Sequence, residues 1–111
     1  MKHEMRLHNN PFNKIKSGSK TIEMRLYDEK RRLINIGDII EFTNRVNDEK
    51  LNAKVANLYT FNNFDELYKN FNKVCLGYEE NEVATPDDMN IYYSKDEQDK
   101  YGVVAIEIEK L

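Results

Sequence analysis

The sequence predicts an α+β fold, a small and mostly antiparallel β-barrel with a short helix after the first strand and a helical insertion before the last. Segments typical of strands recur about five times, and helical patterns do not alternate with them one for one. At 111 residues the chain can build one hydrophobic core but not two. Closing the barrel would remove sheet edges that so short a chain could not cover. A doubly wound α/β fold is the weaker alternative, because its helices would have to follow its strands regularly.

The first strand is expected over residues 3–8, where Met5 and Leu7 alternate with polar side chains. Asn9, Asn10 and Pro11 then supply a cap and a proline of the kind that opens a helix. Phe12 and Ile15 would share one side of this short helix, and the Ser17–Gly18 pair would end it.

The second strand, residues 20–26, carries the most chemically informative pattern in the chain. Ile22, Met24 and Leu26 fall on one phase, and Glu23 and Arg25 fall on the other. Successive strand side chains point to opposite faces, so one face is expected to be apolar and the other to carry an acid beside a base. Lys20 falls on the apolar phase, and it joins the charged face only if a bend assisted by Gly18 turns its side chain.

The middle of the chain alternates charged connections with strands. Residues 27–36 form a strongly charged connection, and Gly37–Asp38 predicts a turn before a short strand at 39–42. The polar segment 44–50 reads as a hairpin loop, and a long strand is expected over residues 51–61, although its alternation is only partial.

The helical insertion is expected between residues 63 and 98. Its first helix has an apolar stripe at helical spacing, which favours a core role over a base-stacking platform; the stripe consists of Phe64, Leu67, Tyr68 and Phe71. Residues 74–82 are acidic, Thr85–Pro86 predicts a helix start, and Ser94 caps a further short helix. Residues 101–109 form the closing strand.

Composition limits the protein class. No apolar run approaches the roughly 18 residues that span a bilayer, and residues 1–6 lack the apolar segment of a signal peptide, so we expect a cytoplasmic protein without membrane contact. The single cysteine, Cys75, can form no internal disulfide or cysteine-based zinc site. His3 and His8, five apart on a strand, would point to opposite faces. We therefore expect a single domain over residues 1–111 with no metal and no cofactor.

Charge is distributed unevenly along the chain. Residues 1–32 contain nine bases and four acids, a net of +5, whereas the remainder carries −8 and the whole chain −3. Such asymmetry can present a basic face to phosphate, although separation in sequence need not become separation in space. Basic side chains outside the second strand are the expected auxiliary contacts to RNA: Lys14, Lys16, Arg31 and Arg32.

Lys20, Glu23 and Arg25 are the predicted binding residues. Arg25 offers a planar fork for phosphate or a base edge, Lys20 a point charge, and Glu23 an acceptor for exocyclic amino groups. Together they predict a cleft for RNA or a nucleotide. The alternative is that Glu23 and Arg25 merely pair with each other, or across strands, at the surface.

Three segments together resemble the ASCH-domain family, which shares the PUA-like β-barrel fold. The resemblance covers essentially the whole chain. The matching residues are Pro11, Phe12, Ile15, Ser17, Gly18, Lys20, Thr21, Ile22, Glu23, Arg25 and Leu26 in the first segment, Gly37, Asp38, Ile40 and Phe42 in the second, and residues 101–106 in the third. It implies a cleft between barrel and helices lined by Lys20, Glu23 and Arg25. It also implies a role in RNA binding or RNA-linked regulation.

Some small bacterial members of that family are amidohydrolases that deacetylate N4-acetylcytidine. Their mechanism uses the motif lysine, a threonine three residues later and a late glutamate, so the resemblance implies Lys20 as one catalytic residue. Glu23 stands at the threonine position, where it could act as a general base while Lys20 steadies an oxyanion. Glu79, Glu80 and Glu82 are the candidates for the late acid. Hydrolysis of a modified nucleoside is therefore the alternative to simple binding.

Overall fold

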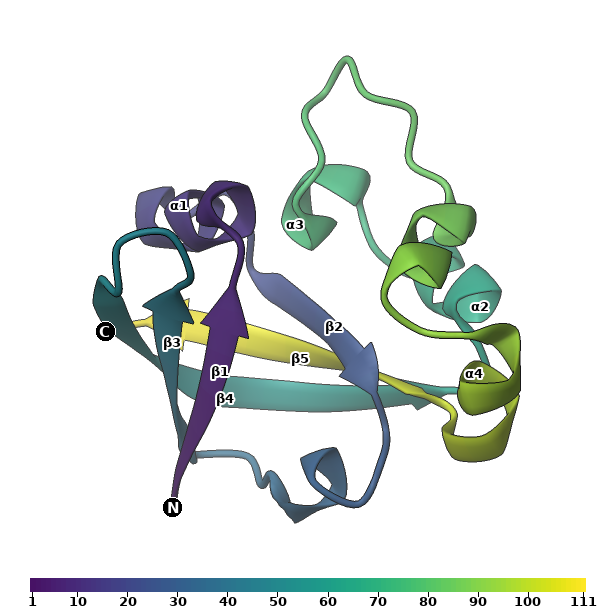
Figure 1. The fold of residues 1–111 in the computed structure, drawn as a ribbon, viewed down its shortest axis with the longest axis horizontal. Coiled ribbons are helices and arrows are strands. Elements are labelled where there is room, and N and C mark those ends of the chain that lie inside the picture. The colour runs from purple at the N-terminus through teal and green to yellow at the C-terminus, as the bar shows by residue number, and fades with distance from the viewer.

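The computed structural model describes residues 1–111 and shows a curled five-stranded sheet with helices packed around it (Figure 1). The strand order is β1-β3-β4-β5-β2, and only the β1–β3 pair is parallel. The strands are β1 (Lys2–Leu7), β2 (Ile22–Leu26), β3 (Ile39–Asn44), β4 (Lys50–Phe61) and β5 (Val103–Lys110). The predicted α+β class, mostly antiparallel, is confirmed.

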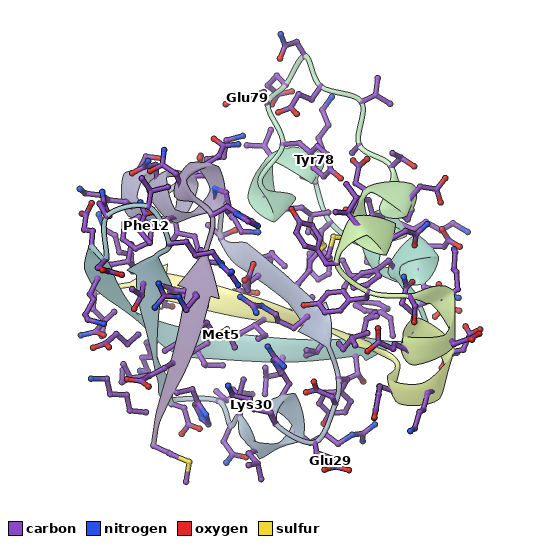
Figure 2. All side chains as sticks on the ribbon, in the orientation of Figure 1. Met5, Phe12, Glu29, Lys30, Tyr78 and Glu79 are labelled. Carbon is purple, nitrogen blue, oxygen red and sulfur yellow. The ribbon has the colours of Figure 1, made fainter.

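The helices lie where the sequence pattern indicates, with one addition. Helix α1 (Asn9–Ser17) follows β1, and the insertion between β4 and β5 comprises α2 (Phe64–Lys69), α3 (Lys73–Leu76), η2 (Pro86–Ile91) and α4 (Lys95–Tyr101). Helix α3 is not predicted by the sequence pattern, which shows only that this segment is acidic. The short helical turn η1 (Arg31–Leu33) lies in the charged connection after β2. Figure 2 places Tyr78 and Glu79 on the long loop between α3 and η2.

Local side-chain bonds explain most of the helix starts. Thr85 caps η2, and Ser94 and Glu97 form a complete capping box at the start of α4. The expected asparagine cap of α1 is wrong: His8 occupies the N-cap position without a side-chain bond, and Pro11 lies within the first turn.

Two hydrophobic clusters lie on opposite faces of β5, which explains why this strand is apolar along most of its length. Val104, Ile106 and Ile108 join a cluster on the concave side with residues of β1, β3 and α1. Val103 and Ala105 face a second cluster, in which Ile22, Met24 and Leu26 of β2 pack against the helical insertion. A strand buried on both faces carries apolar side chains on both phases.

The partial alternation of β4 has a local cause. Its pairing with β5 shifts register between Val55 and Asn57, which leaves Ala56 as an extra residue. Each such bulge moves the following side chains to the opposite face. Val55 therefore belongs to the concave cluster, whereas Tyr59 and Phe61 pack against the second one.

The sheet curls into a half-barrel, and its two edges, β1 and β2, form no backbone ladder with each other. The sheet therefore does not close into the expected barrel through backbone hydrogen bonds, and a gap separates β1 from β2. Side chains of both edge strands line a cavity there. None of the helices has the length and apolar character needed to cross a bilayer.

Candidate functional site

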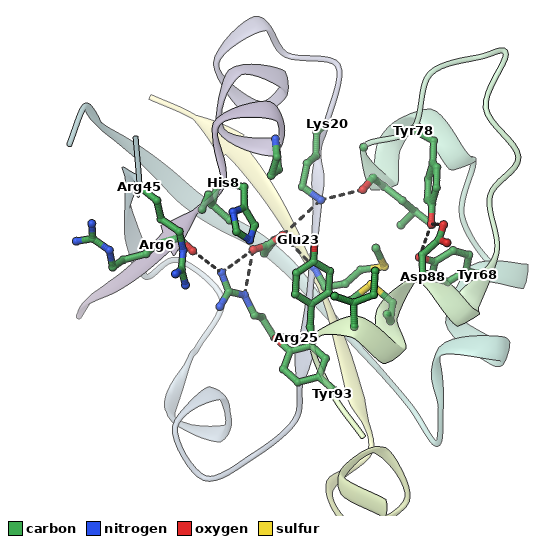
Figure 3. Close-up of a pocket in the computed structure, with 18 of the residues that line it drawn as sticks. Arg6, His8, Lys20, Glu23, Arg25, Arg45, Tyr68, Tyr78, Asp88 and Tyr93 are labelled. Carbon is green, nitrogen blue, oxygen red and sulfur yellow. Dashed lines mark hydrogen bonds and ion pairs between the residues drawn. The ribbon is translucent and has the colours of Figure 1, made fainter. Parts of the chain in front are cut away.

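A cavity of about 720 Å³ lies between the β1 and β2 edges and the helical insertion. This volume falls within the range of small-molecule sites. Its polar lining comes from elements far apart in the sequence: Arg6, His8, Lys20, Glu23, Arg25, Arg31, Arg45, Tyr68, Tyr78, Glu82, Asp88, Tyr92 and Tyr93. Many of these are labelled in Figure 3.

Lys20, Glu23 and Arg25 form a continuous buried ion network in this cavity (Figure 3). The Lys20 Nζ atom lies 3.3 Å from Glu23 Oε1, and Arg25 Nη2 lies 2.9 Å from Glu23 Oε2. Glu23 and Arg25 pair with Ile106 and Val104 of β5, so they share the concave face of the sheet with the first hydrophobic cluster. The two side chains pair with each other as the alternative reading proposed, but they do so in a buried setting.

The Lys20 amine has three partners within the protein. Besides Glu23, its amine donates to the carbonyl oxygens of Ile22 at 2.7 Å and Leu76 at 2.8 Å. The side chain is only 4% exposed. Burial lowers the pKa of Lys20, and the attraction of Glu23 offsets this effect only in part.

Both carboxylate oxygens of Glu23 also have partners within the protein. Its Oε1 atom faces Lys20 and accepts from the backbone N–H of Met24, and its Oε2 atom accepts two bonds from Arg25. Burial by itself would raise the pKa of Glu23, but the two neighbouring cations outweigh it and hold the pKa below its ordinary value. The carboxylate therefore remains ionised at neutral pH.

Arg25 is held along one edge and free along another. Its Nε and Nη2 atoms donate to Glu23 Oε2 at 3.0 and 2.9 Å, and Nη2 also donates to the backbone oxygen of Arg6 on β1. Burial would lower the pKa of Arg25, but Glu23 and Tyr93 raise it. None of these bonds uses Nη1, and the Tyr93 side chain is the other polar neighbour of the guanidinium. Nη1 is therefore the part of Arg25 that is left for a ligand.

Further arginines make this wall of the cavity basic. Arg6 and Arg45 are exposed, and Arg45 forms no ion pair. Arg31 is paired with Asp28 at 3.0 Å, and its buried Nε atom has no hydrogen-bond partner. Only Arg25 is backed by a buried carboxylate.

The opposite wall carries hydroxyls and a carboxylate (Figure 3). Tyr78 donates to Asp88 Oδ2 at 2.7 Å, so the 2.8 Å contact between Tyr68 and Tyr78 must be a donation from the Tyr68 hydroxyl. Burial, followed by these bonds, raises the pKa of Tyr78 above its ordinary value. The chain of bonds ends at Asp88, whose Oδ1 atom is unused. This wall accepts hydrogen bonds, whereas the arginine wall donates them.

The auxiliary basic residues predicted from sequence separate in space. Arg31 lines the cavity, whereas Lys14 lies behind it, donating to the Gly77 oxygen and pairing with Glu79 and Glu82. Lys16 and Arg32 do not line the cavity. Lys16 pairs with Glu49, while Arg32 donates to the Tyr101 backbone oxygen and lies over the Tyr27 ring. Of the three late acids, Glu82 lines the cavity but Glu79 and Glu80 do not.

Several cavity residues were not predicted from the sequence. Tyr68 was assigned to the apolar stripe of its helix; its ring does pack against the second cluster, but its hydroxyl reaches the cavity. Arg45 comes from a hairpin loop, and Asp88 from a helix start. The only sequence signal for this part of the cavity was the pair of consecutive aromatic residues Tyr92 and Tyr93. No group of three or more metal-ligating side chains comes together.

A family model described as the ASCH domain matches residues 5–111. The chain belongs to the ASCH domain family. Members of this PUA-like fold family are often linked to RNA binding.

Solved structures support the ASCH assignment. The chain is similar to the hypothetical protein PH0355, with 36% identity over 100% of both chains and a TM-score of 0.85. It is also similar to the protein PF0455 from Pyrococcus furiosus, with 37% identity, a TM-score of 0.72 and coverage of 100% of this chain and 98% of that one. An ASCH protein from Zymomonas mobilis shares the fold at 14% identity and a TM-score of 0.71, over 97% of this chain and 66% of its own. No curated protein matches the sequence.

Proposed function

We propose that this ASCH domain binds a nucleotide or a short RNA segment in the cavity, with a phosphate against Arg25. The observation that carries the proposal is the one-sided grip of Glu23 on Arg25, whose bonds use Nε and Nη2 and leave Nη1 outside them. A guanidinium immobilised before binding loses little entropy when it meets an anion. Arg6 and Arg45 would add a positive field around it.

The opposite polarity of the two walls favours a nucleotide over a plain polyanion. A phosphate suits the arginine wall, whereas the Asp88 carboxylate would repel it and the hydroxyl protons of Tyr68 and Tyr78 are already engaged. Those groups instead suit hydrogen-bond donors such as ribose hydroxyls or exocyclic amino groups. A nucleotide carries both kinds of group within one molecule, and RNA supplies them repeatedly.

Lys20 and Glu23 receive a different role from the one expected. Both side chains are almost fully buried, and their hydrogen-bonding capacity is used within the protein. We assign them to positioning Arg25 rather than to contacting the ligand.

The hydrolase alternative gains no support from this geometry. A general base must be free to take a proton from water. Glu23 instead has a lowered pKa and accepts bonds on both oxygens. Lys20 donates to two backbone carbonyls and forms an ion pair with Glu23. Binding without turnover is the reading that the contacts favour.

The test is a titration with the four ribonucleoside monophosphates and a six-nucleotide single-stranded RNA, at two salt concentrations. Arg45→Ala should weaken RNA binding and reduce its salt dependence by about one phosphate contact. Arg25→Lys should cost about tenfold or more, because an ammonium cannot make the paired bonds to Glu23 that hold the cation in place.

Lys16→Ala is the matched control, because it removes the same charge from outside the cavity. It should leave affinity almost unchanged. A wild-type protein that binds none of these ligands at low salt would overturn the proposal. Equal losses in Lys16→Ala and Arg45→Ala would show that binding does not use the cavity.

A further inference from the structure

His8 and Tyr92 face each other across part of the cavity lining. His8 stands between β1 and α1, and Tyr92 directly follows η2, so the pair joins two separate walls. Their ring centroids are 6.1 Å apart and the ring planes are inclined by 39°. Figure 3 shows the His8 ring within the group of side chains around the cavity.

Both rings are accessible, in contrast to the aromatic pairs of the core. Tyr92 is 56% exposed, and the adjacent Ile91 is 83% exposed. By comparison, Phe71 packs edge-on against Tyr59 and Phe61 beside the second cluster. The Tyr92 ring has Tyr93 as its other aromatic neighbour, with ring centroids 6.4 Å apart, and its hydroxyl forms no hydrogen bond within the protein, so more than half of the side chain remains available to a ligand.

We propose that His8 and Tyr92 form a stacking clamp for one nucleobase, an inference that rests on the proposed nucleotide-binding function. Stacked bases are spaced about 3.4 Å apart, so a base held between two rings needs about 6.8 Å. The observed 6.1 Å is short of this by only about 0.7 Å. Two exposed side chains can open by that amount, and turn more nearly parallel, without disturbing the core.

The position of the clamp relative to the arginines supports a base rather than another flat group. Arg6 lies two residues before His8 on the same segment, and the backbone N–H of Arg45 donates to the Leu7 oxygen at 2.8 Å. Arg25, the proposed phosphate ligand, donates from Nη2 to the Arg6 backbone oxygen, so a phosphate held there would bring its own base close to the two rings. Every base has an aromatic face, so the clamp would accept different bases with similar strength.

The test compares hexaadenylate with an abasic strand of the same length and charge, at one salt concentration. Wild-type protein should bind hexaadenylate at least about fivefold more tightly, the lower end of what one stacked base contributes. Tyr92→Ala and His8→Ala should each reduce this preference and leave abasic binding unchanged. Tyr92→Phe, which keeps the ring, should retain the preference.

Folding should not interfere with this comparison. Tyr92 is exposed, and His8 makes no side-chain cap for α1. Equal wild-type affinity for both strands would overturn the clamp while leaving the proposed phosphate site intact. A preference that survives in Tyr92→Ala would also overturn it, because the base would then be bound elsewhere. Failure of both strands to bind would remove the proposed function and the clamp together.

Discussion

Replacing Glu23 by Gln keeps the shape of the side chain but removes the only anion between two buried cations. At an effective dielectric constant of about 20, ion pairs at 3.3 and 2.9 Å each contribute about 5 to 6 kcal/mol of attraction. Desolvation of the three charges offsets much of this. Loss of one partner from a buried pair typically costs about 3 to 5 kcal/mol. We expect Glu23→Gln to lower the free energy of unfolding by that amount, against about 5 to 15 kcal/mol for a whole domain.

Urea denaturation followed by circular dichroism measures this loss, and tyrosine fluorescence provides a second probe because the chain has no Trp. Glu41→Gln is the matched control. Glu41 also sits between two cations, Lys2 at 2.9 Å and Lys50 at 3.5 Å, but both lysine side chains are more than half exposed. Water replaces such contacts readily, so the control should lose far less stability than Glu23→Gln.

The pH dependence of the Glu23→Gln variant gives an independent check. Burial already lowers the pKa of Lys20 below its ordinary 10.5, and loss of Glu23 removes the attraction that opposes this effect. Above the lowered pKa but below 10.5, the unfolded chain binds more protons than the folded one, so stability rises with pH. The variant should therefore recover part of its loss as the pH is raised toward about 10. Equal losses in the two variants, with no such recovery, would refute the buried network.

Three further predictions concern other parts of the fold. We expect Gly18→Ala to lower the free energy of unfolding by about 1 to 2 kcal/mol, measured by urea denaturation, and Gly77→Ala to lower it further. Both glycines have positive φ, but only at Gly77 would an added Cβ meet the Lys20 side chain, at 3.2 Å. The Asp38 carboxyl, bonded by His3 and the Asn35 N–H, has its pKa lowered from 3.8 to about 2. Its stabilisation should be complete above pH 3.8 and disappear as the pH falls through about 2, and Asp38→Asn should flatten that part of a pH series of unfolding measurements. Tyr78→Phe should cost about 1 to 2 kcal/mol and Tyr68→Phe less, because the first breaks the bonds to both Tyr68 and Asp88; equal melting temperatures for the two variants would contradict this.

Short-range sequence patterns predict most of the helices and strands, but only part of the cavity lining. Lys14 and Lys16 show why the prediction of the cavity is incomplete. Two residues on one helix point in different directions, and the sequence indicates that much. It does not indicate that the end of α3 packs against the Lys14 side of the helix. Lys14 is therefore buried against Gly77, whereas Lys16 pairs with Glu49 outside the cavity. Arg45 and Asp88 were missed for the same reason, since each reaches the cavity through contacts distant in sequence.

The sequence by itself determined where most strands lie along the chain, the one-sided apolar pattern of β2, the family motif and the shared face of Glu23 and Arg25. Only the tertiary structure decided that these charges are buried. The pairing of Glu23 with Ile106 places them on the concave face, and the carbonyl of Leu76 receives the Lys20 amine. Whether a charged strand face meets water or protein depends on what long-range pairing puts opposite it, and no local pattern contains that information.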